Sequence, residues 1–216
     1  MTLRIELEAH LAAQLGDPAT ARTLAAILLE ETISWQPPVL APDHLTTLFA
    51  FTFGNRMLPN GNRTPGPVNL ALADIVVSLH QWNRAPVFAQ WEVAEAIGDR
   101  IPAAMVTAIN PLRDPRGEPL YLGTTGVIEE VARMVGDPGS LGHVGIVAFA
   151  DHIYRCVAAC HRLGFDAHAP AGVDMPRNYD PESGQAWCRD RMVYLLHDIM
   201  IRITERRAAV VGTIWR

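Results

Sequence analysis

The feature that most constrains the fold is a regular alternation of short apolar strand candidates with helical segments between residues 46 and 207. The expected strands are Thr46–Phe53, Pro86–Gln90, Ala103–Ile109, His143–Ala150 and Phe165–His168. The expected helices are Pro67–Trp82, Trp91–Ile97, Thr124–Val135, Asp151–Leu163 and Gln185–Arg207. A parallel pair of strands needs a crossover long enough to hold a helix, so this alternation favours parallel pairing. We predict an α/β three-layer sandwich with a mainly parallel sheet of about five strands.

Two further helices are expected before the first strand. Leu3–Leu15 carries an apolar stripe, and Asp17 with Pro18 supplies an N-cap and a first-turn proline for a helix over Pro18–Ser34. We predict that residues 1–36 form an N-terminal helical hairpin that covers one face or edge of the sheet. A chain of 216 residues suits one sizeable core better than two, so we expect a single α/β domain over residues 1–216.

Charge and composition exclude several classes of function. The net charge is -5 and no basic run occurs, so we expect no nucleic-acid partner. No apolar stretch approaches the roughly 20 residues of a membrane span, and the N-terminus does not fit a signal peptide, so we expect no membrane partner and a cytoplasmic location. All 18 basic residues are arginine, which rules out lysine chemistry and leaves arginine, histidine or backbone N–H groups to hold an anion.

Polar residues follow every predicted strand where the carboxyl ends should meet. In an open parallel sheet this edge is where ligands bind. The candidate ligand-binding residues are Gly54, Asn55, Arg56, Asn69, Gln90, Thr124, Thr125, Glu129, Asp151 and Arg155. Each also has a structural interpretation, because turn glycines, helix N-caps and acids that complement a helix dipole use the same residue types. We expect Asn55, Arg56, Glu92, Thr125 and His152 to share one hollow.

His152 and Glu92 are the candidate catalytic residues. His152 and Arg155 lie three residues apart near the start of a predicted helix and so share a face, where arginine can bind phosphate or carboxylate with two hydrogen bonds. Histidine can act as a general acid or base near neutral pH. Glu92 and Glu129 could hold a ribose hydroxyl, an amine or a metal.

A zinc site is an alternative for the same helix. His152, Cys156 and Cys160 recur every four residues and share a face, with His143 and His161 nearby in sequence. A cysteine stripe on a helix that packs against a sheet is normally core, however, and an odd number of cysteines in a chain of this size favours reduced thiols. We therefore predict buried thiols and no metal site.

The order of these features resembles the DUF218 family, also called the YdcF-like or SanA/ElyC-like family. The resemblance rests on the strand that ends in Phe53-Gly54-Asn55-Arg56, on residues 69–73, 90–94 and 125–130, and above all on residues 148–156, which contain His152 and Arg155 after a strand. It implies a DUF218-like core over residues 45–207, a Rossmann-like strand arrangement and a nucleotide-type ligand. An adenosyl compound such as S-adenosylmethionine, or a nucleotide, would suit the mixed polarity of these residues.

Three functions remain open at this point. The first is an enzyme that acts on a small polar or anionic metabolite, of nucleotide or adenosyl type, with His152 and Glu92 as acid and base and with Arg56 and Arg155 holding the anion. The second is a non-catalytic binding or regulatory module on the same fold. The third is a structural role, in which the chain forms a homodimer and Leu3–Ser34 is the dimerisation hairpin.

Overall fold

The computed structural model describes residues 2–113, 116, 119–120 and 122–214, and the chain divides into two compact units. One unit holds residues 37–194 and contains the sheet. The other consists of residues 1–36 together with residues 195–216. The expectation of a single domain over the whole chain stays a prediction.

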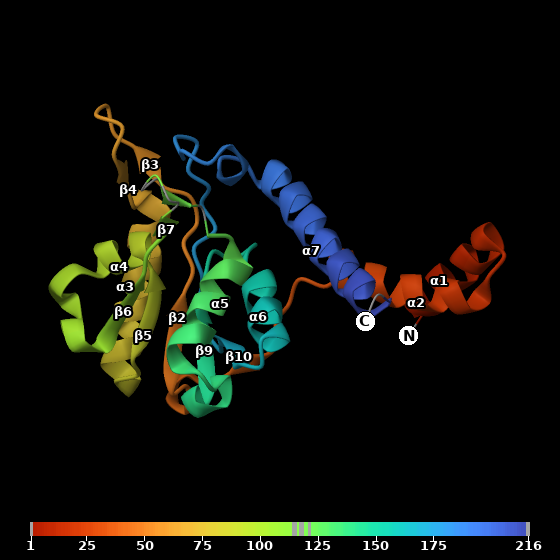
Figure 1. Ribbon diagram of the computed structural model, residues 1–216, viewed down its shortest axis with the longest axis horizontal. Helices are drawn as coiled ribbons and strands as arrows, with labels where there is room; N and C mark the ends of the chain where they lie inside the picture. The colour runs from red at the N-terminus through yellow and green to blue at the C-terminus, as the bar shows by residue number, and fades with distance from the viewer. Residues whose placement is uncertain (1, 114–115, 117–118, 121, 215–216) are drawn as a thin grey trace. The chain divides into compact units, whose positions relative to one another are not determined.

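The sheet has six strands, all parallel, and confirms the predicted α/β class (Figure 1). Its order is β1-β10-β9-β2-β5-β6. The strands are β1 (Val39–Leu40), β2 (Thr47–Ala50), β5 (Val87–Gln90), β6 (Val106–Ile109), β9 (His143–Val147) and β10 (Asp166–Pro170). The five predicted strands therefore follow the Rossmann order, 3-2-1-4-5 in chain order, with the two-residue strand β1 added beside β10.

Four helices cover the sheet: α3 (Gly66–Asn83), α4 (Trp91–Ile97), α5 (Thr124–Val135) and α6 (Ile153–Arg162). The chain steps from β2 through β5 to β6 and then returns across the sheet to β9 and β10. Crossovers between parallel strands are right-handed, so the helices that connect β2, β5 and β6 should lie on one face of the sheet. The helices that lead to β9 and β10 should lie on the opposite face. In agreement with this, α3 packs against α4, and α5 packs against α6 (Figure 1).

The core lies between the central strands and these helices. Leu48 in β2 and Ile146 and Val147 in β9 are fully buried, as expected for central parallel strands covered on both faces. Phe49 packs edge-on against Phe165, which immediately precedes β10. The continuous apolar runs of the sequence therefore report burial on both sides of the sheet.

Four segments differ from the sequence-based expectation. The loop after β2 contains a short antiparallel hairpin, β3 (Arg56–Met57) and β4 (Arg63–Thr64), and a second one, β7 (Leu112–Arg113) and β8 (Pro119–Leu120), follows β6. The final helix, α7 (Arg191–Ile214), begins six residues later than predicted, because Asp190 accepts a hydrogen bond from the backbone N–H of Val193 and so caps it. Residues 103–105, expected to start β6, form a 3-10 turn instead.

The smaller unit consists of α1 (Thr2–Leu15), α2 (Pro18–Leu28) and the part of α7 beyond residue 194. Asp17 caps α2 as predicted, accepting from the backbone N–H groups of Ala19 at 2.9 Å and Thr20 at 3.2 Å. A turn of π-helix, Leu29–Ile33, ends the predicted second helix. The predicted N-terminal helices are thus present. Among the described residues, no helix is long and apolar enough to cross a membrane.

Candidate functional site

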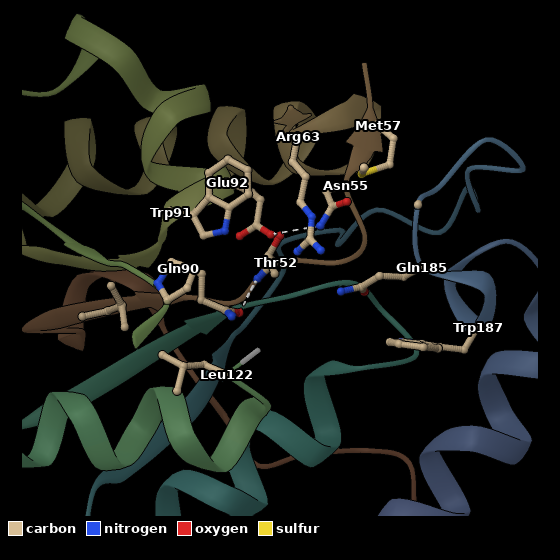
Figure 2. A pocket seen from close by; sticks show the side chains of 13 residues that line it. Thr52, Asn55, Met57, Arg63, Gln90, Trp91, Glu92, Leu122, Gln185 and Trp187 are labelled. Carbon is tan, nitrogen blue, oxygen red and sulfur yellow. Dashed lines mark hydrogen bonds between the residues drawn. The ribbon is translucent and has the colours of Figure 1, made fainter. Parts of the chain in front are cut away.

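A pocket of about 290 Å³ lies at the carboxyl ends of β2 and β5, next to the point where the strand order reverses between β2 and β9 (Figure 2). This is the edge at which open parallel sheets bind ligands. The pocket is lined by Thr52, Asn55, Met57, Arg63, Gln90, Trp91, Glu92, Ile109, Pro111, Leu122, Gly184, Gln185 and Trp187. Its lining thus combines amides and a hydroxyl with two indole rings, one carboxyl group and one guanidinium group.

Glu92 is the most unusual of these groups. Its side chain is only 4% exposed, in the first turn of α4 directly after β5. The Asn55 amide donates to Oε1 at 3.4 Å, whereas Oε2 is buried and has no hydrogen-bond partner among the described residues. Burial raises the pKa of Glu92 to about 7. The backbone N–H of Glu92 itself, the side chains of Asn55 and Thr52 and the charge of Arg63 partly offset this rise in pKa. At neutral pH this carboxyl can therefore both accept and donate a proton.

The arginine that lines this pocket is Arg63, whereas Arg56 is not among its lining residues. Arg56 forms a two-bond ion pair with Asp180, both contacts being 2.9 Å, and a further ion pair with Glu182. Arg63, from β4, has no ion pair with any residue that the structure describes. Figure 2 shows its guanidinium group pointing toward Glu92 and Asn55. Arg63 was not selected from the sequence, because no local pattern ranks it above Arg56 in the same hairpin.

Asn69 and Gln90 shape the pocket wall through the backbone. The side-chain oxygen Oδ1 of Asn69 accepts from the Thr52 hydroxyl at 2.8 Å and from the backbone N–H of Phe53 at 2.9 Å. The side-chain amide Nδ2 of Asn69 donates to the backbone carbonyl of Gly54. The side-chain oxygen Oε1 of Gln90 accepts from the backbone N–H of Thr52 at 2.8 Å. Asn69 is fully buried, and its hydrogen bonds fix the turn after β2.

Gly54 is required by this turn for two reasons. Its φ of 71° lies in the left-handed region that glycine adopts without strain. A Cβ at this position would also collide with the hydroxyl of Ser183, from the loop before α7. The same loop donates from the Gly184 N–H to the Asn55 carbonyl at 2.6 Å. The loop thereby holds Asn55 against Glu92.

His152 lies in a smaller cavity of about 30 Å³ on the same edge of the sheet. Arg155 and Thr124 line this cavity too, and it shares Thr52, Gln90, Leu122, Gln185 and Trp187 with the larger pocket. Arg155 donates to the Thr124 hydroxyl at 2.8 Å and to the Tyr194 hydroxyl at 3.4 Å. The predicted histidine and arginine are therefore brought together, in a space about the size of one water molecule.

The remaining candidates line neither cavity. Asp151 forms an ion pair with Arg191 at 2.8 Å and accepts from the Tyr179 hydroxyl at 3.0 Å. Glu129 is exposed on α5, and Thr125 lies one residue beyond Thr124 on the same helix. The expected common hollow thus holds Glu92 and Asn55, with His152 beside it and with Arg56 and Thr125 outside.

The helix with the cysteine stripe is part of the core. Cys156 and Cys160 are fully buried in α6, and burial raises the pKa of the Cys160 thiol far above its ordinary value. Within the described residues, one group of three metal-ligating side chains converges, and it does not include these two cysteines or His152. Comparison with protein-family models, curated proteins and solved structures finds no match to this chain.

Proposed function

We propose that this chain is an enzyme that acts on a small polar metabolite of nucleotide or adenosyl type, bound at the carboxyl ends of β2 and β5. The observation that carries the proposal is the buried Glu92 carboxyl group, which lies in a pocket and keeps one oxygen without a partner among the described residues. Leaving such an atom unsatisfied costs about 1–3 kcal/mol, which a ligand hydroxyl or amine at Oε2 would recover.

The other lining residues support the ligand class. Trp91 and Trp187 offer flat apolar surfaces for a base, and Glu92 and Gln90 can bind hydroxyl groups. Rossmann-type folds place an acidic side chain against the ribose of their cofactor. Arg63 carries the charge needed for a phosphate or carboxylate group. A volume of about 290 Å³ suits a single nucleoside-sized ligand.

In the proposed reaction, Glu92 transfers a proton to or from the bound metabolite. Its pKa of about 7 populates both protonation states at neutral pH, which is the condition for efficient general acid–base catalysis. Arg63 holds the anionic end of the metabolite, and Asn55 keeps the carboxyl group oriented. His152 lies in the adjoining cavity, where it can exchange a proton with a water molecule. We also propose that this chain belongs to the DUF218 family, which its sequence resembles.

A melting-temperature screen against adenosine, AMP, other nucleotides and S-adenosylmethionine tests the ligand class. Saturation to about 100 times Kd stabilises a protein by about 2.7 kcal/mol, or about 5–10 °C for a chain of this size. If none of these compounds raises the melting temperature, the ligand class is wrong. If one does, incubation with it and chromatography of the products separates an enzyme from a non-catalytic module.

Two variants then assign the roles. Glu92→Gln should retain binding and lose turnover, whereas Glu95→Gln, an exposed position on the same helix, should retain both. Arg63→Gln should weaken binding of AMP more than binding of adenosine, because only AMP carries the phosphate group. Equal turnover in Glu92→Gln and wild type would remove Glu92 from the mechanism.

A further inference from the structure

A second cluster of reactive side chains lies at the opposite ends of the strands from the pocket, and it does not depend on the proposed function. His143 is the first residue of β9, and Asp166 is the first residue of β10. The parallel register pairs these two residues, so their side chains leave the sheet on the same face. His168 lies two residues after Asp166, and the two-residue period of a strand returns it to that face. Local pairing alone thus brings the three side chains together.

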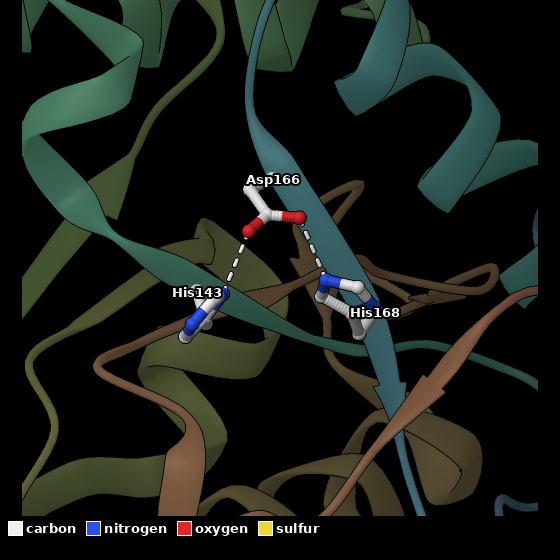
Figure 3. A group of neighbouring side chains, drawn as sticks. All are labelled: His143, Asp166 and His168. Carbon is white, nitrogen blue, oxygen red and sulfur yellow. Dashed lines mark hydrogen bonds and ion pairs between the residues drawn. The ribbon is translucent and has the colours of Figure 1, made fainter.

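The three side chains converge closely. His143 Nδ1 lies 2.6 Å from one oxygen of Asp166, and His168 Nε2 lies 2.7 Å from the other. Figure 3 shows both imidazole rings directed at the one carboxylate between them. One ligand atom from each residue lies within 4.8 Å of those from the other two. His168 Nδ1 is buried and has no hydrogen-bond partner among the described residues.

We propose that His143, Asp166 and His168 form a Zn²⁺ site. Two imidazole nitrogens and one carboxylate oxygen are ligands that Zn²⁺ takes at about 2.0–2.2 Å, with a fourth position left for water. Ligand atoms at these bond lengths in a tetrahedron are separated by roughly 3.4 Å. The N–O distances of 2.6 and 2.7 Å would therefore open by less than 1 Å. Each coordinating ring nitrogen would bind the ion without its proton, which would pass to the other nitrogen of the same ring or to solvent.

The surroundings allow this movement. The side chains of His143 and Asp166 are about half exposed, so they can shift without disturbing the core, whereas His168 is mostly buried and anchors the site. A third histidine, His161 of α6, has its ring centroid 6.3 Å from that of His168. His161 contacts the carbonyl oxygen of Ala167 at 2.7 Å. The bound ion would link the first residues of β9 and β10.

Equilibrium titration of the metal-stripped full-length chain with Zn²⁺ tests the proposal. Wild type should bind one Zn²⁺ per chain, and Mg²⁺, which prefers oxygen ligands, should not compete. His143→Ala and Asp166→Asn should each lower Zn²⁺ affinity about 10-fold or more. His10→Ala, which removes an exposed histidine from α1, should bind like wild type. Absence of Zn²⁺ binding by wild type, or equal affinities in wild type and His143→Ala, would overturn the site.

A second measurement avoids substitutions altogether. Nitrogen NMR of the histidine rings in the wild-type chain should show that Zn²⁺ shifts the resonances of His143 and His168, while that of His10 stays in place. Shifts confined to other histidines would show that the ion binds elsewhere. Because the melting screen with nucleotides concerns the other end of the sheet, either proposal can fail while the other stands.

Discussion

Replacing Glu92 with glutamine should remove a large pH dependence from the stability of the fold. The wild-type carboxyl group is 4% exposed, and its pKa is about 7 in the folded chain against an ordinary value of 4.5. Burial is the main cause, because it penalises the charged form. The folded state therefore binds the proton more tightly than the unfolded state does, and the stabilisation from this group is lost as the pH rises.

The magnitude follows from proton linkage. The stabilisation is fully present below pH 4.5 and falls away as the pH rises through 7. The difference between the two pKa values corresponds to about 3 kcal/mol, at about 1.4 kcal/mol per tenfold change in proton affinity. Of this, about 2.5 kcal/mol is lost between pH 5 and pH 8. Glutamine is uncharged throughout, so Glu92→Gln should gain about that much stability relative to wild type over the interval.

Urea unfolding of both proteins at pH 5, 6, 7 and 8, followed by circular dichroism, measures this difference directly. Glu95→Gln is the matched control, because Glu95 lies on the same helix and is exposed, so its stability should follow that of wild type at every pH. A constant difference between wild type and Glu92→Gln from pH 5 to pH 8 would refute the reasoning. It would mean that the Glu92 carboxyl ionises as it does in water, and the proposed proton transfer would lose its basis.

Three further predictions concern an ion pair, a turn glycine and the buried cysteines. Arg56→Ala should lower the free energy of unfolding by about 1–2 kcal/mol, since it leaves the buried Asp180 carboxylate without its ion pair. This loss of stability should be smaller at acid pH, because the ion pair lowers the pKa of Asp180. Gly54→Ala should destabilise the fold by more than about 1 kcal/mol, and by more than Gly61→Ala, where φ is also positive but the space is open. The three buried cysteines should resist a thiol reagent in the native protein and react with it after unfolding in urea. Equal reaction rates in the native and the unfolded protein would contradict this prediction.

Much of the fold could be predicted from local patterns. The limits of α5 match the predicted helix Thr124–Val135, and the capped start of α2 matches the prediction from Asp17 and Pro18. The alternation of strands and helices predicted parallel pairing, which the structure confirms. A ligand site at the carboxyl ends stays a prediction. The short strand β1 was missed, because two residues are too few to show a period of two.

The site was predicted less completely, because its residues compete for partners. Glu92 and Asn55 line the pocket as expected. Arg56 instead forms an ion pair with Asp180, which lies 124 residues further along the chain. The arginine that faces the pocket is Arg63. Both arginines belong to the same polar loop, and no local pattern ranks one above the other.

By itself, the sequence determined the element types, the parallel sheet and the edge where polar residues gather, since helical and strand periods depend on near neighbours in the chain. Only the tertiary structure decided which charged side chains form ion pairs and which line the pocket, because those contacts join segments that are distant in sequence. It buried Glu92 with one oxygen unsatisfied by the described residues, and it set His143 beside Asp166 through the register of two strands. Both features arise from the order in which strands pair, which is a property of the whole sheet.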